Sequence, residues 1–379
     1  MAKIKFVIDH KDFFCDPHLI RDNQFSIHST LKDYLVSFKE NSSPVLEISN
    51  LLNQNKKNLL LIDKNIFKLY QSEFNISPER IFIADATEFF KTLDGVTAVL
   101  NFLQKNELSK NEALIVVGGG ITQEVGAFVA AIYKRGIPWH YFPTTLLSMC
   151  DSCIGGKASI NYNNAKNQLG LFSPPTQLII YPEFLKTLSR NDIQSGLGEI
   201  LKLCIIGGEY FIKLYQSHVT HGNVTSQNSF RYLIEAALCI KKSVVEEDEF
   251  ETNYRRSMNY GHTLGHAIES LSHYKISHGQ AVVIGMILAN DLSYQKKLLN
   301  KAGRDFLNQL CFDLLDKSVL LYLRNINFDN IIDFIQKDKK TMGEYIYFVL
   351  IKALGETCFE KFKIDEQLFL DIQIAFKTI

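Results

Sequence analysis

The first half of the chain alternates short, unbroken apolar runs with stretches of helical periodicity. The runs are flanked by Gly, Pro or Asp, which is typical of strands that are buried on both faces of a sheet. We expect such strands at 58–62, 80–83, 113–117, 137–142 and 177–181. Because strands that alternate with helices favour a parallel sheet, the pattern predicts an α/β fold of the nucleotide-binding kind.

One helix of this half is well marked. Apolar residues recur at helical spacing over 121–135, and Gly136 with Pro138 forms a stop signal. Residues 1–57 are much less informative, and we expect no more there than a loop at 41–44.

The pattern changes after Tyr181 and Pro182, and from there to about Tyr345 helical periodicity is nearly continuous. Helices are expected at 230–247, 258–272 and 280–299, and a strand at 345–351. We therefore predict an α/β N-terminal half with a parallel nucleotide-binding sheet, residues 1–181, followed by a mainly α-helical C-terminal domain, residues 182–379.

Charge and hydropathy exclude several classes of function. The chain has 41 Lys plus Arg and 41 Asp plus Glu, so a net charge near zero argues against nucleic acid or an anionic membrane as a partner. No apolar stretch approaches the roughly 20 residues of a membrane-spanning helix. The first residues, Met-Ala-Lys-Ile-Lys-Phe, lack the apolar segment of a signal peptide. We expect a cytoplasmic protein.

The seven cysteines form no repeating framework, which fits reduced thiols better than disulfides. Cys150 and Cys153 have the spacing of a zinc or redox motif. No second pair completes a four-thiolate site, and Asp151 stands inside the pair. The better interpretation is that Cys150 and Cys153 are small apolar residues that pack in the fold.

A glycine turn follows the third expected strand directly. Gly118, Gly119 and Gly120 lead at once into the helix at 121–135. Glycines let backbone amides approach a phosphate, and the start of a helix adds partial positive charge. Because the next glycine is Gly126, the spacing departs from G-x-G-x-x-G. A dinucleotide site and a simple tight turn both remain open at this point.

Two histidines in the second half have the spacing of metal ligands. His262 and His266 lie four residues apart, so they share one face of a helix. Thr263 stands where a zinc protease has its glutamate, so no hydrolytic base is present there. His278 follows before another helix, and Glu199 is the best fourth member because an unpaired acid is costly on an apolar helix. The alternative is four polar residues on solvated faces.

The stretch 143–175 is rich in small and polar residues and is read as loops. Lys157 follows two glycines, and Lys166 with Asn167 follows a polar turn. Isolated lysines on glycine-rich loops suit phosphate contact. Further candidate cations are Arg135, Lys241, Arg255 and the segment 337–340. Each of them alone is better explained as a surface charge than as a ligand.

Taken together, these segments resemble the 3-dehydroquinate synthase family of sugar phosphate cyclases over roughly residues 58 to 355. The matching stretches of the first half are GGG at 118–120, KRGIP at 134–138, PTTLL at 143–147, DSCIGGK at 151–157 and KNQLG at 166–170. Those of the second half are GLGEILK at 196–202, DEFE at 248–251, NYGHTLGHAIE at 259–269, HGQAV at 278–282 and DKK at 338–340. Their common order makes coincidence implausible.

The resemblance implies a role for each matching residue. A zinc or cobalt ion is held by Glu199, His262 and His278. NAD lies along Gly119, Gly120, Thr144 and Thr145, with Glu88, Lys91, Glu124, Asp151 and Lys166 as neighbours. Substrate phosphate is faced by Lys157, Asn167, His266 and Lys339, with Arg135 contributed by a partner subunit of a homodimer. The substrate carboxylate is held by Lys241, Arg255 and Asn259, and a ring hydroxyl by Lys202.

The implied enzyme is a phosphate-eliminating lyase of the shikimate pathway of aromatic amino acid biosynthesis. It converts a phosphorylated sugar acid, 3-deoxy-arabino-heptulosonate 7-phosphate, to 3-dehydroquinate and phosphate. The steps are transient oxidation by NAD, phosphate elimination, re-reduction and aldol closure. The alternatives are a related cyclase acting on sedoheptulose 7-phosphate and a metal-dependent NAD alcohol dehydrogenase.

Two features bear on cofactor geometry and substrate choice. Gln123 and Glu124 stand where typical relatives carry glycine and aspartate, which predicts an altered contact with NAD. Lys241 and Arg255 are both retained, and burying two unpaired cations costs several kcal/mol. This favours a substrate that carries a carboxylate.

Overall fold

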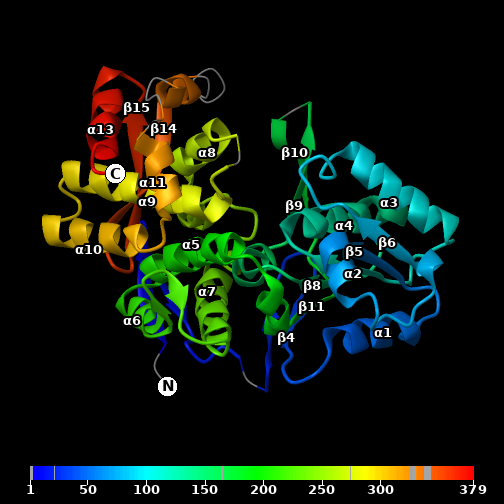
Figure 1. Cartoon of the computed structure of the whole chain (residues 1–379). Helices are drawn as coiled ribbons and strands as arrows, with labels where there is room; N and C mark the ends of the chain where they lie inside the picture. The colour runs from blue at the N-terminus through cyan, green and yellow to red at the C-terminus, as the bar shows by residue number, and fades with distance from the viewer. Residues whose placement is uncertain are drawn as a thin grey trace. The chain divides into compact units, whose positions relative to one another are not determined.

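The computed structural model describes residues 3–20, 22–163, 165–273, 275–324, 326, 330–336 and 343–379 (Figure 1). It divides into two compact units. The sheet unit is His18–Leu188, and the helical unit joins Met1–Pro17 to Ser189–Ile379. The boundary lies close to the one expected after residue 181, but the first 17 residues group with the second half of the chain.

The sheet unit is built on a seven-stranded sheet of order β3-β4-β11-β8-β7-β5-β6. Its strands are β3 (Gln24–Ile27), β4 (Tyr34–Phe38), β5 (Leu59–Asp63), β6 (Ile81–Ala84), β7 (Leu114–Gly118), β8 (Trp139–Pro143) and β11 (Gln177–Ile180). All neighbours pair in parallel except β3, an antiparallel edge strand. The predicted parallel sheet is confirmed, with the five expected strands at β5, β6, β7, β8 and β11.

Helices pack on this sheet because its central strands are apolar toward both faces, as the fully buried β7 shows. They are α1 (Pro44–Gln54), α2 (Lys64–Tyr70), α3 (Leu93–Lys105) and α4 (Gly120–Ile132). The helix expected at 121–135 is therefore α4, and a short 3-10 turn, Tyr133–Arg135, follows it. At Gly126 an added Cβ would lie 2.7 Å from a methyl of Val116, so this glycine lets α4 approach β7 closely.

The loop expected over 143–175 is wrong in its centre. Residues Lys157–Tyr162 and Ala165–Phe172 form an antiparallel hairpin, β9 and β10. On β9 the buried Ala158 and Ile160 alternate with more accessible residues, which is the period of a strand. The signal is short, and the ladder is irregular between Ala165 and Leu169, so polar composition obscured it.

The helical unit contains a four-stranded sheet of order β14-β15-β1-β2. Its strands are β1 (Ile4–Ile8), β2 (Lys11–Cys15), β14 (Tyr345–Ala353) and β15 (Glu356–Lys363). The expected strand at 345–351 is confirmed as β14. The first two strands were missed, although Asp9 and His10, at φ 47° and 68°, form the two-residue turn of a hairpin. Because β1 pairs with β15, the chain start belongs to this unit.

The helices of this unit include α9, which is buried along most of its length against α5, α8, α10 and α13. They are α5 (Arg190–Gly207), α6 (Glu209–His218), α7 (Ser229–Val245), α8 (His262–Leu271), α9 (His278–Gln295), α10 (Lys301–Phe312), α11 (Lys317–Arg324) and α13 (Glu366–Phe376). The expected helices at 230–247 and 280–299 are α7 and α9. The helix expected at 258–272 begins only at His262, since Gly261 has a φ of 80°. Among the described residues no helix is both long and apolar enough to cross a membrane.

Candidate functional site

Three helices of the helical unit place the predicted metal ligands side by side. Glycines allow α5 and α9 to touch: a Cβ at Gly198 would lie 2.5 Å from the carbonyl oxygen of Gly279, and one at Gly279 1.8 Å from that of Ser195. This approach brings Glu199, in the middle of α5, next to His278, the first residue of α9. Glu199 is fully buried.

The three side chains converge on one carboxylate oxygen, and we call Glu199, His262 and His278 the His–Glu cluster. Oε1 of Glu199 lies 3.6 Å from Nε2 of His262 and 3.4 Å from Nε2 of His278. The other oxygen, Oε2, faces the ammonium group of Lys202, which is 1% exposed. Neither oxygen makes a hydrogen bond of good geometry among the described residues. One oxygen and two imidazole nitrogens thus surround a common point.

The second nitrogen of each histidine is already engaged. Nδ1 of His278 donates to Oε2 of Glu269 over 3.1 Å, and Nδ1 of His262 donates to the carbonyl oxygen of Tyr260 over 3.3 Å. With both Nδ1 atoms engaged as donors in this assignment, Nε2 is the nitrogen of each ring that is left to coordinate a metal, which displaces any proton it carries. This is the arrangement that a metal ligand needs.

Charge within the cluster is strongly coupled. Burial alone would raise the pKa of Glu199, but the charges of Lys202 and the histidines hold the pKa well below its usual range. Burial and the nearby Lys202 lower the pKa of His262. Burial also opposes the charge of His278, yet contacts with Glu199 and Glu269 raise its pKa to about 10. Without a metal, the cluster therefore holds a proton on His278.

His266 stands beside the cluster. Its ring centroid lies 5.2 Å from that of His262 and 5.7 Å from that of His278. Ligand nitrogens of these three histidines all lie within 4.8 Å of one another, so His266 is also within reach of a shared ion. Its predicted contact with substrate phosphate stays a prediction.

The residues predicted to hold a carboxylate are buried cations of the same unit. Lys241, on α7, is 6% exposed, and Arg255, in a 3-10 turn, is 3% exposed. The backbone of Arg255 donates to Asp248 over 2.9 Å, which fixes the turn. The amide of Asn259 donates to Oε1 of Glu251 over 2.7 Å, so the chain already provides it with an acceptor. Lys339 lies outside the described residues.

In the sheet unit the glycine turn lies where the strand order reverses. The chain passes from β5 outward to β6, and from β7 to β8 on the other side, so the turn after β7 is a topological switch point. A Cβ at Gly119 would lie 3.0 Å from Cγ2 of Thr145, whereas one at Gly120 would meet no atom within 4 Å. Gly119 and Gly120 thus open the start of α4 to a ligand.

Thr144 and Thr145 follow the adjacent strand at the same edge of the sheet, since Gly118 pairs with Pro143. The amide of Thr144 donates to the carbonyl of Gly118 over 3.1 Å. The bulky Gln123 is buried, and its amide donates to the backbone of Ser152 over 2.7 Å. This contact directs the Gln123 side chain to the turn that contains Asp151.

Three further predicted residues, Lys91, Glu124 and Asn167, meet at the hairpin. Lys91, 6% exposed, forms an ion pair with Glu124 and donates to Oδ1 of Asn167 over 2.7 Å. Ser159 donates to Glu124 and to Asn167, at 2.9 and 3.0 Å. We call Lys91, Glu124, Ser159 and Asn167 the hairpin network. Lys166 pairs with Glu88 at 2.9 Å beside it.

Glu88 is held by a similar set of contacts. Asn161 donates to Oε2 of Glu88 over 2.7 Å. Burial raises the pKa of this carboxyl, but its hydrogen bonds to Lys166 and Asn161 outweigh burial and lower the pKa.

Two predicted residues do not join this group. Arg135 is exposed and lies one helix away from the glycine turn, because α4 spans 13 residues, about 20 Å. Lys157 is exposed at the start of β9. Asp151 lies in a π-helical turn, Ser148–Ser152, in which Cys150 is buried as a free thiol. Burial of both Cys150 and Cys153 agrees with a packing role.

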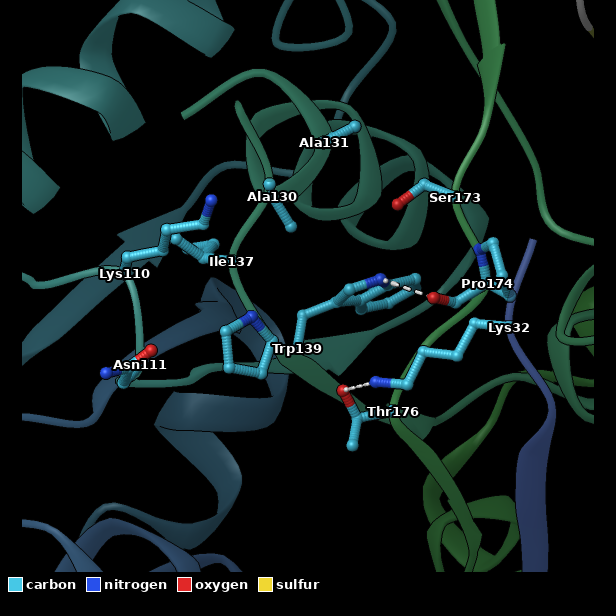
Figure 2. A pocket seen from close by; sticks show the side chains of 12 residues that line it. Lys32, Lys110, Asn111, Ala130, Ala131, Ile137, Trp139, Ser173, Pro174 and Thr176 are labelled. Atoms are coloured by element: carbon cyan, nitrogen blue, oxygen red, sulfur yellow. Dashed lines mark hydrogen bonds between the residues drawn. The ribbon is translucent and has the colours of Figure 1, made fainter. Parts of the chain in front are cut away.

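A cavity of about 450 Å³ lies near Gly136, just past Arg135 (Figure 2). The indole of Trp139 donates to the carbonyl of Pro174 over 3.2 Å, and Lys32 donates to Thr176 over 3.0 Å. The predicted site residues are not among its lining residues. It is separate from the glycine turn, at the other end of α4.

The sequence analysis missed Glu269, the hydrogen-bond partner of His278. A usable signal exists: Glu269 follows His262 by seven residues and His266 by three, so all three share one helix face. Asn161 and Ser159 were missed because the hairpin was read as a loop.

Comparison with known proteins bears on the family and the fold of the chain. Family models described as 3-dehydroquinate synthase N-terminal and C-terminal match residues 81–195 and 196–341. A 3-dehydroquinate synthase of Streptococcus equi subsp. equi is 34% identical over 347 residues, 90% of this chain and 95% of that protein. The fold is similar to that of 2-deoxy-scyllo-inosose synthase complexed with carbaglucose-6-phosphate, NAD+ and Co2+, with a TM-score of 0.78, 21% identity and coverage of 93% and 99% of the two chains.

It is also similar to 2-epi-5-epi-valiolone synthase from Streptomyces hygroscopicus with NAD+ and Zn2+ bound, with a TM-score of 0.75, 22% identity and coverage of 93% and 98%. The predicted fold class and the prediction of a lyase-type cyclase are confirmed. The chain belongs to the 3-dehydroquinate synthase family.

Proposed function

We propose that this enzyme converts 3-deoxy-arabino-heptulosonate 7-phosphate to 3-dehydroquinate and phosphate, using NAD and one zinc or cobalt ion. The observation that carries the proposal is the convergence of Glu199, His262 and His278 beside the buried Lys202. Family membership and the NAD+ with Co2+ or Zn2+ named for two similar structures support it.

The residues present fit a divalent metal. Oε2 of the fully buried Glu199 already faces the ammonium group of Lys202, whereas Oε1 faces the Nε2 atoms of His262 and His278 without a hydrogen bond of good geometry, so a cation at that point would satisfy Oε1. Three protein ligands of the O, N, N type leave a position open for substrate, which is typical of catalytic zinc. The engaged Nδ1 atoms leave the two Nε2 atoms for coordination.

The residues present also fit a dinucleotide. The space at Gly120 and the backbone amides at the start of α4 suit a pyrophosphate. We assign NAD binding to Gly119, Gly120, Thr144 and Thr145, with Glu88, Lys91, Glu124, Asp151 and Lys166 as neighbours.

When bound, NAD and the metal supply hydride transfer and polarisation of the reacting alcohol. The remaining work belongs to the chain. Lys202, charged and buried beside Glu199, is suited to donate a hydrogen bond to a ring hydroxyl. Lys241, Arg255 and Asn259 bind and orient the substrate carboxylate in this proposal. Phosphate contacts are assigned to Lys157, Asn167, His266 and Lys339.

Arg135 is assigned to the phosphate site of a partner in a homodimer. Its exposure and its distance along α4 from the glycine turn support a role outside its own subunit. Mixing Arg135→Ala and Glu199→Gln subunits tests this, because a mixed dimer regains one complete site. Activity of the mixture that stays at the level of the separate variants would contradict the assignment.

The proposed reaction is tested with the metal-loaded protein, NAD+ and 3-deoxy-arabino-heptulosonate 7-phosphate. We expect phosphate release with 3-dehydroquinate as product and no net NADH, because NADH returns its hydride to the substrate intermediate and is re-oxidised to NAD+ within each turnover. Turnover of sedoheptulose 7-phosphate instead would identify a cyclase for a substrate without a carboxylate. Steady accumulation of NADH with a simple alcohol would identify a dehydrogenase.

A further inference from the structure

Glu269 links the two helices that carry the proposed metal ligands. It lies near the end of α8, and its carboxylate accepts from Nδ1 of His278 on α9 at 3.1 Å. The side chain of Glu269 is only 15% exposed, and that of His278 is 33% exposed. The opposite ring nitrogen, Nε2 of His278, faces Glu199 at 3.4 Å. The imidazole is therefore held between two carboxylates, one on each side.

We propose that Glu269 is a positioning residue that fixes His278 as a metal ligand. By accepting the Nδ1 proton it selects the tautomer whose Nε2 lone pair points to the cluster, and it sets the plane of the ring. A carboxylate partner also makes the imidazole a better donor to a cation. This inference rests on the proposed metal site.

The two histidines differ in how they are held. The acceptor for Nδ1 of His262 is the neutral carbonyl of Tyr260, which belongs to the backbone just before α8. The acceptor for His278 is a charged side chain from a different helix. Only the second contact can be altered by a single side-chain substitution, so it offers a clean test.

The link between α8 and α9 does not depend on Glu269 alone. In the segment between the two helices the amide of Ile276 donates to Oγ of Ser272 over 3.2 Å, and the hydroxyl of Tyr322, on α11, donates to the carbonyl of Leu271 at the end of α8 over 3.3 Å. Glycines bring the same helices into contact, since a Cβ at Gly265 would lie 2.9 Å from the carbonyl oxygen of Ala281. Loss of the carboxylate should therefore leave the helices in place while releasing the ring of His278.

The test compares Glu269→Ala, Glu269→Gln and the wild-type protein as full chains. The affinity for Co2+ is measured by competition with a chelating dye, and the visible absorption of bound Co2+ reports its ligand geometry. We expect Glu269→Ala to bind Co2+ roughly 10- to 100-fold more weakly with a changed spectrum. Glu269→Gln keeps an acceptor oxygen and should recover part of the affinity.

Glu246→Gln is the matched control, because Glu246 is similarly half-buried and pairs with Lys242 on α7 instead of with a histidine. It should bind Co2+ as the wild type does. If the wild type binds Co2+ and Glu269→Ala binds it with the same affinity and the same spectrum, the positioning role is overturned and the proposed function is left intact. Failure of the wild type to bind Co2+ would overturn both. Thermal melting of the metal-free Glu269→Gln variant shows whether that variant is folded.

Discussion

The two units bury their charged side chains in different ways. In the sheet unit Lys91, Glu124 and their neighbours satisfy one another, with Asn167 and Ser159 completing the hydrogen bonds. In the helical unit Glu199 is fully buried beside Lys202, and its oxygens lack hydrogen bonds of good geometry among the described residues. The hairpin network is complete without a ligand, whereas the His–Glu cluster is arranged as a cation would require.

This difference indicates what each unit does with its ligand. The cluster is preorganised, so a metal finds its donors in place and removes an electrostatic cost. At the glycine turn the unit offers backbone amides and open space at Gly120, and the charged groups nearby are already paired. There, a ligand is recognised by shape and helix-terminal charge.

The largest expected effect follows from removing the charge of Glu199. Glu199→Gln leaves Lys202 buried without its carboxylate partner, which should lower the free energy of unfolding of the metal-free protein by about 3–5 kcal/mol. Glu209→Gln is the control, because its pair with Lys213 is exposed and screened by solvent, so its removal should change stability far less. Urea unfolding measures both losses; similar losses would show that burial of the pair of Glu199 with Lys202 does not set its contribution to stability.

A pH titration sharpens the comparison, since burial and the charge of Lys32 lower the pKa of His140 to about 4. In the unfolded chain His140, with a pKa near 6.5, therefore binds a proton at pH values at which His140 of the folded chain stays neutral. The contribution of neutral His140 to the free energy of unfolding is therefore fully present above about pH 6.5. It is lost as the pH falls toward the pKa of His140 in the folded chain. Between about pH 7 and pH 5 this histidine should account for about 2 kcal/mol.

His140→Leu should reduce the pH dependence of the free energy of unfolding by that amount. His278 is the opposite case, because its carboxylate partners raise its pKa to about 10, so it is already protonated throughout this range in the metal-free protein. Chemical unfolding at a series of pH values measures the effect. An unchanged slope in His140→Leu would show that this imidazole is not kept neutral by burial.

The smallest expected effect concerns the glycine turn. Gly120→Ala adds a methyl group where no atom lies within 4 Å, so folding should be unaffected while NAD+ binds at least about tenfold more weakly, a loss of about 1.4 kcal/mol. Gly119→Ala is the contrast, because its Cβ would press on Thr145 at 3.0 Å and should lower stability as well. Calorimetric titration with NAD+ measures affinity; wild-type binding by Gly120→Ala would place the nucleotide elsewhere.

Long, regular signals were readable from the sequence. The five apolar runs became parallel strands, and the spacing of His262 and His278 with Glu199 pointed to side chains that the fold brings together. Local patterns failed where tertiary pairing decides structure. The strand β1 gains its place by pairing with β15, more than 300 residues away in sequence, and β2 pairs with β1.

Parts of the site were beyond sequence reasoning for a similar reason. The contact between Glu269 and His278 depends on how α8 packs on α9, which close backbone approach at Gly265 and Gly285 allows. The hairpin network depends on pairing of β9 with β10, whose polar composition resembles a loop. Lys339 lies outside the described residues, so its role stays a prediction.

The central claim is that Glu199, His262 and His278 hold one divalent ion. Titration of the metal-free protein with Co2+, followed by calorimetry and visible absorption, tests it most directly. We predict one Co2+ per chain in the wild type and loss of most of the affinity in Glu199→Gln, with no loss in Glu209→Gln. Equal Co2+ binding by wild type and Glu199→Gln, or none by the wild type, would contradict the account.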